Sequence, residues 1–250
     1  MTCFVSALLK VNEKAEFNLF DDGTSSYSGD VVQSGGGFAY RVFSKITKTG
    51  AHAARAEKIY VNNKEMCQSK AADIICQIPA MTEEFLDIAN RIFSVQESVD
   101  RTKEIIFLSQ PSTGRQSLAD DMQRLIDILK PYKEKITVRL HPREIDFEKY
   151  KDFQIDTSKE FWELKVSQLE MDGKVLVSDY STAQITPKIL FDKEPRLLFT
   201  YKMASTYNLE EKMSFDNVVK YVKENYRDKS KIMVPNNEEE LQICLQQIAK

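Results

Sequence analysis

The chain has 250 residues, of which 42% are hydrophobic and 29% charged, with 35 Lys and Arg against 38 Asp and Glu and a formal net charge of −3. This composition is typical of a folded globular protein and excludes a disordered chain, and the missing basic surplus argues against a nucleic-acid binder. No apolar run approaches the roughly 18 residues that a membrane-spanning helix needs.

The start of the chain and its cysteines indicate a cytoplasmic protein. The first ten residues have no basic segment and no small-residue cleavage site, so we do not expect a signal peptide. Cys3, Cys67, Cys76 and Cys244 form no CxxC pair, and the chain has only two histidines. We therefore expect no metal site, and we expect the cysteines to be small buried residues in a reducing compartment.

The hydrophobic patterns alternate between strand and helix along most of the chain. They predict a strand ending at residue 20, a helix over 82–97 with Thr82 as its N-cap, a strand over 105–109, a helix over 118–129, a strand over 136–140, a helix around 161–169, a strand over 175–177, a helix from 182, a strand over 197–199, and helices over 218–225 and 238–248. This alternation predicts a parallel sheet with helices on both faces. We place one such α/β unit at residues 101–250 and a less regular, partial one at 1–100.

Polar residues follow three of the predicted strands. Gln110 and Ser112 come after the first, His141 and Pro142 after the second, and the Ser181-Thr182 pair after the third, where a helix begins. Ligands of open parallel sheets bind at the carboxyl ends of the strands. Hydroxyls and free backbone N–H groups at a helix N-terminus suit a phosphate, although Ser181 or Thr182 could equally serve as an ordinary helix cap.

Two further groups suggest acid–base chemistry. His141 could donate a proton or a hydrogen bond to a leaving phosphate, although a lone histidine is more often structural, and the neighbouring Arg139 and Arg143 could be solvated charges. The Asp21-Asp22-Gly23 segment follows a predicted strand end. A carboxylate there could act as a general base, but paired Asp before Gly is also a common turn.

In their order along the chain, these motifs resemble the three short motifs of bacterial sialyltransferases: an acidic pair with Gly, His-Pro, and Ser-Ser/Thr. The chain is most similar to glycosyltransferase family 52, whose local sequences resemble Phe20-Asp-Asp-Gly-Thr24, Leu140-His-Pro-Arg143 and Phe161-Trp-Glu163. The resemblance covers roughly residues 15–202.

The resemblance implies an α/β protein of the GT-B type, with two Rossmann-like units facing a cleft. It further implies an inverting, metal-independent sialyltransferase that needs no cofactor and moves sialic acid from CMP-sialic acid to a terminal galactose of a lipooligosaccharide or capsule. In the family that the chain resembles, a nearly complete Rossmann-like unit precedes the acidic motif, whereas here the motif begins at residue 21. We therefore expect the first unit to be N-terminally incomplete. A homo-oligomer and peripheral contact with the inner face of the membrane are left open.

The resemblance also assigns roles to individual residues. Asp21 would be the base that deprotonates the acceptor, with Asp22 and Gly23 on the acceptor side. His141 would be the acid or the phosphate-stabilising donor. The remaining motif residues would bind the donor and its phosphate: Ser181, Thr182, Pro142, Gln110 and Ser112.

Two other functions compete with this interpretation. Proteins that transfer phosphoglycerol or phosphoribitol from CDP-glycerol or CDP-ribitol also contain His-Pro and a segment like Ser178-Asp-Tyr-Ser-Thr182. The other alternative is a non-catalytic remnant that binds CMP or nothing.

Overall fold

The structure is a computed structural model that describes residues 11–12, 15–21, 23, 26–27, 38–47, 56–67, 72–93, 102–111, 116–158 and 160–249. The chain divides into two compact units, Met1–Ala80 and Met81–Lys250. This division falls before helix α4 (Glu83–Ile92), whereas from the sequence we placed residues up to 100 in the first domain. Helix α4 contacts helix α6 (Trp162–Gln168) of the second unit.

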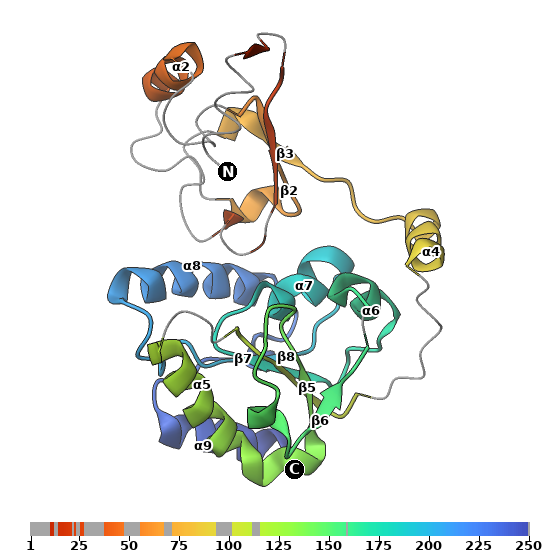
Figure 1. Cartoon of the computed structure of the whole chain (residues 1–250), viewed down its shortest axis with the longest axis vertical. Coiled ribbons are helices and arrows are strands. Elements are labelled where there is room, and N and C mark those ends of the chain that lie inside the picture. Colours follow the sequence, from red (N-terminus) through yellow and green to blue (C-terminus); the bar gives the residue numbers. More distant parts are fainter. Residues whose placement is uncertain are drawn as a thin grey trace. The chain divides into compact units, whose positions relative to one another are not determined.

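The first unit contains a small parallel sheet in the order β1-β2-β3 (Figure 1). Its strands are β1 (Asn18–Phe20), β2 (Lys58–Val61) and β3 (Ile75–Gln77), and helix α2 spans Phe38–Thr47. Strand β1 confirms the strand expected to end at residue 20. The apolar side chains of Ile59, Val61 and Ile75 are buried.

The second unit is built on a six-stranded sheet in the order β6-β5-β4-β7-β8-β9, in which every neighbouring pair is parallel. Its strands are β4 (Ile105–Leu108), β5 (Ile136–Arg139), β6 (Gln154–Asp156), β7 (Val175–Ser178), β8 (Arg196–Phe199) and β9 (Ile232–Met233). The expected α/β class with a parallel sheet is therefore confirmed.

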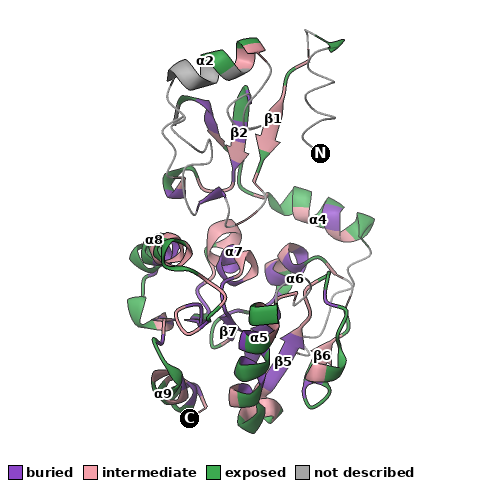
Figure 2. Cartoon of the chain, turned by 60° about the vertical axis from the view of Figure 1, so that its left-hand side comes forward, coloured by how far each residue is buried: buried purple, intermediate pink, exposed green. Residues whose placement is uncertain are grey.

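Helices cover both faces of this sheet, with α5 and α9 on one side and α6, α7 and α8 on the other (Figure 1). Their bounds are α5 (Gln116–Leu129), α7 (Thr182–Phe191), α8 (Leu209–Asn225) and α9 (Glu238–Ile248). Alternate strand residues such as Ile105 and Phe107 pack with Leu125 of α5 and Leu245 of α9 in one buried cluster. The strands at the centre are accordingly the most buried part of the unit (Figure 2).

Helix α8 is longer than the sequence pattern predicted. It begins at Leu209 rather than near residue 218, because Asn208 and Glu211 form a capping box. The Asn208 side chain accepts a hydrogen bond from the Glu211 backbone, and the Glu211 carboxylate accepts one from the backbone of Asn208. This pairing satisfies two N–H groups that a helix N-terminus otherwise leaves open.

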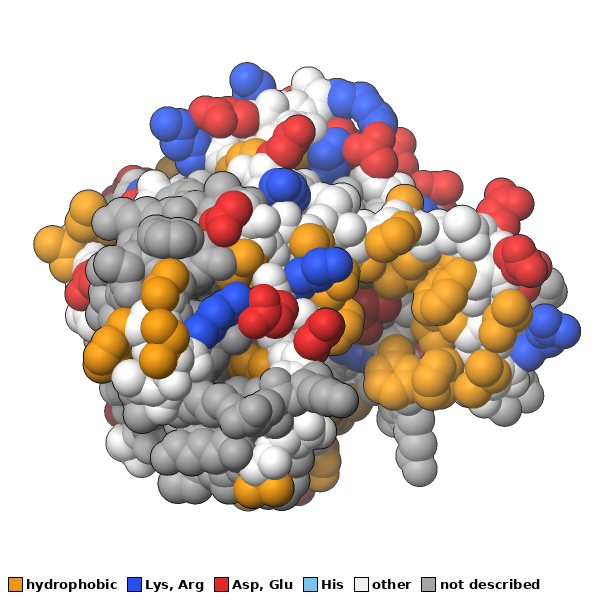
Figure 3. All heavy atoms as spheres, turned by 90° about the horizontal axis from the view of Figure 1, so that it is seen from above, with side chains coloured by type: hydrophobic (Ala, Val, Ile, Leu, Met, Phe, Trp, Pro, Cys, Tyr) orange, Lys and Arg blue, Asp and Glu red, His pale blue; other side chains and the backbone are white. Residues whose placement is uncertain are grey.

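Helix α4 has the cap expected from the sequence, since the Thr82 side chain accepts a hydrogen bond from Phe85 N. Of its apolar stripe, however, only Ala89 is buried. Phe85 and Ile92 are exposed, and Phe93 contacts the ring of Phe161 edge to face. The hydrophobic side chains at the right of Figure 3 belong to this helix and its surroundings.

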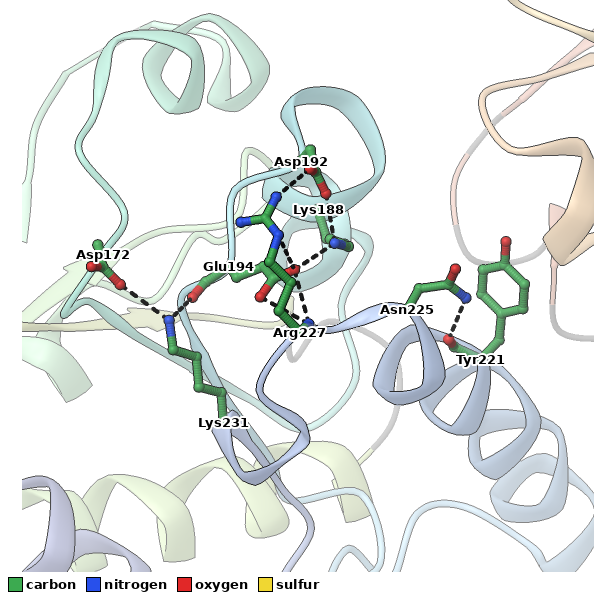
Figure 4. A network of polar contacts seen from close by, with 8 residues as sticks. All are labelled: Asp172, Lys188, Asp192, Glu194, Tyr221, Asn225, Arg227 and Lys231. Carbon is green, nitrogen blue, oxygen red and sulfur yellow. Dashed lines mark hydrogen bonds and ion pairs between the residues drawn. The ribbon is translucent and has the colours of Figure 1, made fainter.

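The amino end of the large sheet is held by a network of charged groups (Figure 4). Glu194 lies at its centre, where its carboxylate accepts hydrogen bonds from Lys188 Nζ at 2.6 Å and from the backbone of Arg227 at 3.1 Å. Lys231 Nζ donates to the Glu194 carbonyl and pairs with the exposed Asp172 at 3.1 Å. The network joins segments that precede β7, β8 and β9, so it stabilises the edge opposite the expected ligand site.

Candidate donor-binding edge

The strand order places a topological switch point between β4 and β7. From β4 the chain runs outward through β5 to β6, and it then returns to the other side of β4 and runs outward through β7, β8 and β9. The loops after β4 and β7 therefore leave the sheet in opposite directions. In open α/β sheets this is where a crevice forms and ligands bind.

Hydrogen bonds tie together three loops at this edge. Gln110 Nε2, after β4, donates to Ser178 Oγ at 3.3 Å and to the Tyr180 carbonyl at 3.1 Å, both at the end of β7. The backbone N–H of His141, after β5, donates to Ser109 Oγ at 2.8 Å. The structure thus brings the segments of Gln110, His141 and Ser181 to one edge, although the sequence separates them widely.

Ser181 is the N-cap of α7, and Thr182 is the first residue of the helix. The Ser181 hydroxyl accepts a hydrogen bond from Ala183 N at 3.3 Å. The capping role, which the sequence left as the alternative, is therefore present. The phosphate role of the pair stays a prediction, which the positive end of a ten-residue helix favours.

His141 is half-buried, and a hydrogen bond from the following turn holds one edge of its ring. Its Nδ1 accepts a hydrogen bond from Arg143 N at 3.1 Å, so the neutral ring carries its proton on Nε2. Burial lowers the pKa of His141, and the charge of Arg143 lowers it further, while Glu144 acts in the opposite direction. At neutral pH the group is therefore a hydrogen-bond donor through Nε2 rather than an imidazolium acid.

A pocket of about 640 Å³ opens beside His141, between the ends of β5 and β6. Most of its wall is apolar, formed by Leu140, Pro142, Phe147 and Ile155. Its polar lining consists of Arg139, His141, Glu144, Asp156, Thr157 and Ser158.

In the polar part of the pocket, two cations share one carboxylate. Asp156 Oδ2 lies 2.7 Å from Arg139 and 2.8 Å from Lys165 Nζ, and the Ser158 hydroxyl accepts hydrogen bonds from both cations. Burial alone would raise the pKa of Asp156, but the hydrogen bonds from Lys165, Arg139 and Ser158 outweigh it and lower the value to about 2. Arg139 is thus not a solvated charge, and this cluster has one more positive than negative charge.

Asp21 lies in the first unit, at the end of β1, where its carboxylate accepts four hydrogen bonds. Gly23 N donates to Oδ1 at 2.9 Å, and Oδ2 accepts from Asn62 N, Asn62 Nδ2 and the Tyr27 hydroxyl. Burial and the bond to Asp21 raise the pKa of Tyr27, which therefore stays a donor. Gly23 has a φ of 113°, as a glycine turn allows, so the turn that the sequence left as the alternative is present.

Two of the expected site residues cannot be placed. Asp22 and Ser112 are outside the described residues. Among the residues that the structure does describe, no three His, Cys, Asp or Glu side chains come together as a metal ion would require. The same residues include no helix that is both long and apolar enough to cross a membrane.

Sequence reasoning did not find Asp156, Ser158 or Lys165 at this edge. Strand β6 has only three residues, with the sequence Gln-Ile-Asp, so no alternating pattern marked it as a strand. The one available signal was Asp156 itself, an acidic residue 17 positions after Arg139 of the predicted strand.

Comparison with solved structures finds a similar chain in the GT-B domain of a sialyltransferase from Photobacterium damselae. The TM-score is 0.45 and the sequence identity 14%, over 92% of this chain and 74% of that one. No protein-family model matches the chain, and no curated protein matches it. The α/β fold rests on the strand pairing itself, and the specific link to glycosyltransferase family 52 stays a prediction.

Proposed function

We propose that the chain is a glycosyltransferase whose second unit binds a nucleotide-linked sugar donor. One observation carries this proposal: hydrogen bonds join the loops after β4, β5 and β7 at the carboxyl edge of the sheet, beside a pocket of about 640 Å³. The edge combines a helix N-terminus, an Nε2–H donor and a pocket whose lining is mostly apolar with several polar groups. These features suit a phosphate linked to a flat, partly apolar nucleoside.

In this proposal each group has a defined role. Ser181, Thr182 and the first turn of α7 hold the phosphate. His141 donates from Nε2 to a phosphate oxygen as the nucleotide leaves, and so offsets the negative charge that develops there. The nucleoside occupies the pocket, with its ring against Leu140 and Phe147.

The finer proposal is an inverting transfer of sialic acid from CMP-sialic acid to a terminal galactose, without a metal or other cofactor. Support for it comes from the order of the three motifs. Asp21 is the proposed base, and its carboxylate must exchange one of its four hydrogen bonds for the acceptor hydroxyl.

We expect Asp21→Asn to slow transfer to lactose about a hundredfold, as loss of a general base does. An unchanged rate in the folded variant would rule out the base role.

A second candidate is transfer of phosphoglycerol from CDP-glycerol. The segment Ser178-Asp-Tyr-Ser-Thr182 favours it, because it resembles a segment that such transferases contain. Both candidates share a cytidine nucleotide and differ in what is attached to it, so a ligand comparison separates them.

Thermal stabilisation tests the proposal. We expect CMP to raise the melting temperature by several degrees, since a ligand at a hundred times its Kd stabilises the folded state by about 2.7 kcal/mol. Thr182→Val preserves the shape of the side chain and should weaken the effect if the hydroxyl contacts phosphate. Stronger stabilisation by CDP-glycerol would favour the second candidate. If neither ligand stabilises a protein that unfolds cooperatively, the result would contradict both transferase functions and favour a non-catalytic remnant.

A further inference from the structure

A buried carboxylate lies beside the proposed phosphate site. Asp179 directly follows β7 and precedes Ser181 by two residues, and its side chain is almost fully buried. Its Oδ1 accepts a hydrogen bond from Thr200 Oγ1 at 2.6 Å. Its Oδ2 is also buried and has no hydrogen-bond partner among the described residues. A buried oxygen without a hydrogen-bond partner lowers the stability of the fold, and native proteins retain few such groups.

Asp179 lines a small cavity of about 20 Å³, which has room for roughly one water molecule. Asp121 of α5 also lines this cavity, and it accepts hydrogen bonds from Ser205 Oγ at 3.0 Å and Thr206 N at 2.8 Å. Arg124 is the cation in the lining, but it is half-exposed and pairs with Glu238. Two acidic groups therefore line the same small cavity, and no cation is bonded to Asp179 in the described part of the chain.

The other polar groups around Asp179 do not neutralise it. Tyr180 stacks on Phe215 of α8, and the Tyr201 hydroxyl donates to Asp216. Lys202 pairs with Asp216 rather than with Asp179. Burial raises the pKa of Asp179 to about 6 against the hydrogen bond from Thr200, and the charge of Asp121 adds to the rise.

The same residue holds the loop in place. The Asp179 carbonyl accepts a hydrogen bond from Tyr201 N at 3.1 Å, and the Ser178 carbonyl accepts one from Thr200 N at 3.0 Å. With the bond between the Thr200 and Asp179 side chains, these contacts fix the end of β7 against the end of β8. The direction in which Ser181 and α7 leave the sheet depends on them.

We propose that Asp179 is a positioning residue for the anion site at the start of α7, and that this site binds anions more tightly once Asp179 is protonated. The inference rests on the proposed function of the same edge. An ionised carboxylate in a poorly solvated interior repels a phosphate held at Ser181, two positions further along the chain, and protonation removes that repulsion. By linkage, binding of the anion favours uptake of the proton.

Calorimetric titration with CMP between pH 5.5 and 8 tests this inference on the full chain. Asp179→Asn retains an oxygen that can accept from Thr200 but carries no charge. We expect it to bind CMP on the order of tenfold more tightly than the wild type at pH 7.5, and equally tightly near pH 5.5. Because both proteins bind the same ligand, titration of CMP itself cancels in the comparison. Asp172→Asn, which removes an exposed charge at the opposite edge, should match the wild type at every pH.

Three outcomes would overturn the inference. The first is equal CMP affinity of Asp179→Asn and the wild type at every pH, and the second is weaker binding by the variant throughout. If Asp179→Asn does not fold, Thr200→Val takes its place: it retains the carboxyl group without its donor and should shift the pH profile of binding upward. An unshifted profile is the third contrary outcome. If CMP binds to neither protein, the proposed function fails as well, whereas binding without a difference contradicts this inference alone.

Discussion

Replacing Asp156 with alanine is expected to lower the free energy of unfolding by about 3–5 kcal/mol, the usual cost of removing one partner from a buried ion pair. The side chains of Arg139, Asp156 and Lys165 are each at most 14% exposed, so the variant leaves two buried cations without their carboxylate. Urea denaturation measures the loss. Glu148→Ala, an exposed carboxylate nearby, should change stability by no more than about 0.5 kcal/mol.

The pH dependence of stability gives an independent check on the same cluster. The pKa of Asp156 is about 2 in the folded protein and lies below the value in the unfolded chain, so its contribution is complete above about pH 4. It should fall by about 2 kcal/mol as the pH drops from about 4 to about 2. The triple variant Arg139→Met, Asp156→Leu, Lys165→Met should lack this loss and remain about as stable as the wild type at pH 7. A wild-type acid profile in the triple variant would show that other groups cause the effect.

The fold of the second unit could be predicted because its elements have strong local patterns. Helix α9 spans the predicted residues 238–248, and its apolar positions Leu241, Leu245 and Ile248 all pack in the core. The strands at the centre of the sheet are short apolar runs buried on both faces, which is the pattern of a parallel sheet. Strand β6 could not be predicted, because pairing with β5 rather than its own three residues makes it a strand.

The candidate edge could be predicted in part for a related reason. Gln110, His141 and Ser181 each follow a recognisable strand, and parallel strands bring their carboxyl ends to the same edge. The burial and the hydrogen-bond partners of each group could not be predicted, since they depend on contacts between distant segments. The sequence shows an aspartate before Tyr180, but only the packing around it shows that Asp179 is buried and lines the same cavity as Asp121.

The two titrating groups at this edge act on different steps in the proposed mechanism. Asp179 should affect how tightly the donor binds, so a change in its protonation should change KM. His141 stabilises charge that develops as the bond to the nucleotide breaks, so replacing it should change kcat. A pH study that separates the two constants can therefore distinguish them, provided that the transfer reaction is observed.

The second large effect is expected at His141, where replacement by alanine should lower kcat about 100- to 1000-fold, as loss of one preorganised donor to a developing anion does. His141→Gln places an amide N–H near the position of Nε2 and should recover part of the rate, while His141→Phe should recover none. Because the pKa of His141 is lowered and its Nδ1 accepts from Arg143 N, the neutral ring is the active form. Wild-type kcat should therefore not fall as the pH rises from about 6.5 to 8. A tenfold fall across that range, absent in His141→Gln, would show instead that an imidazolium acid protonates the leaving group.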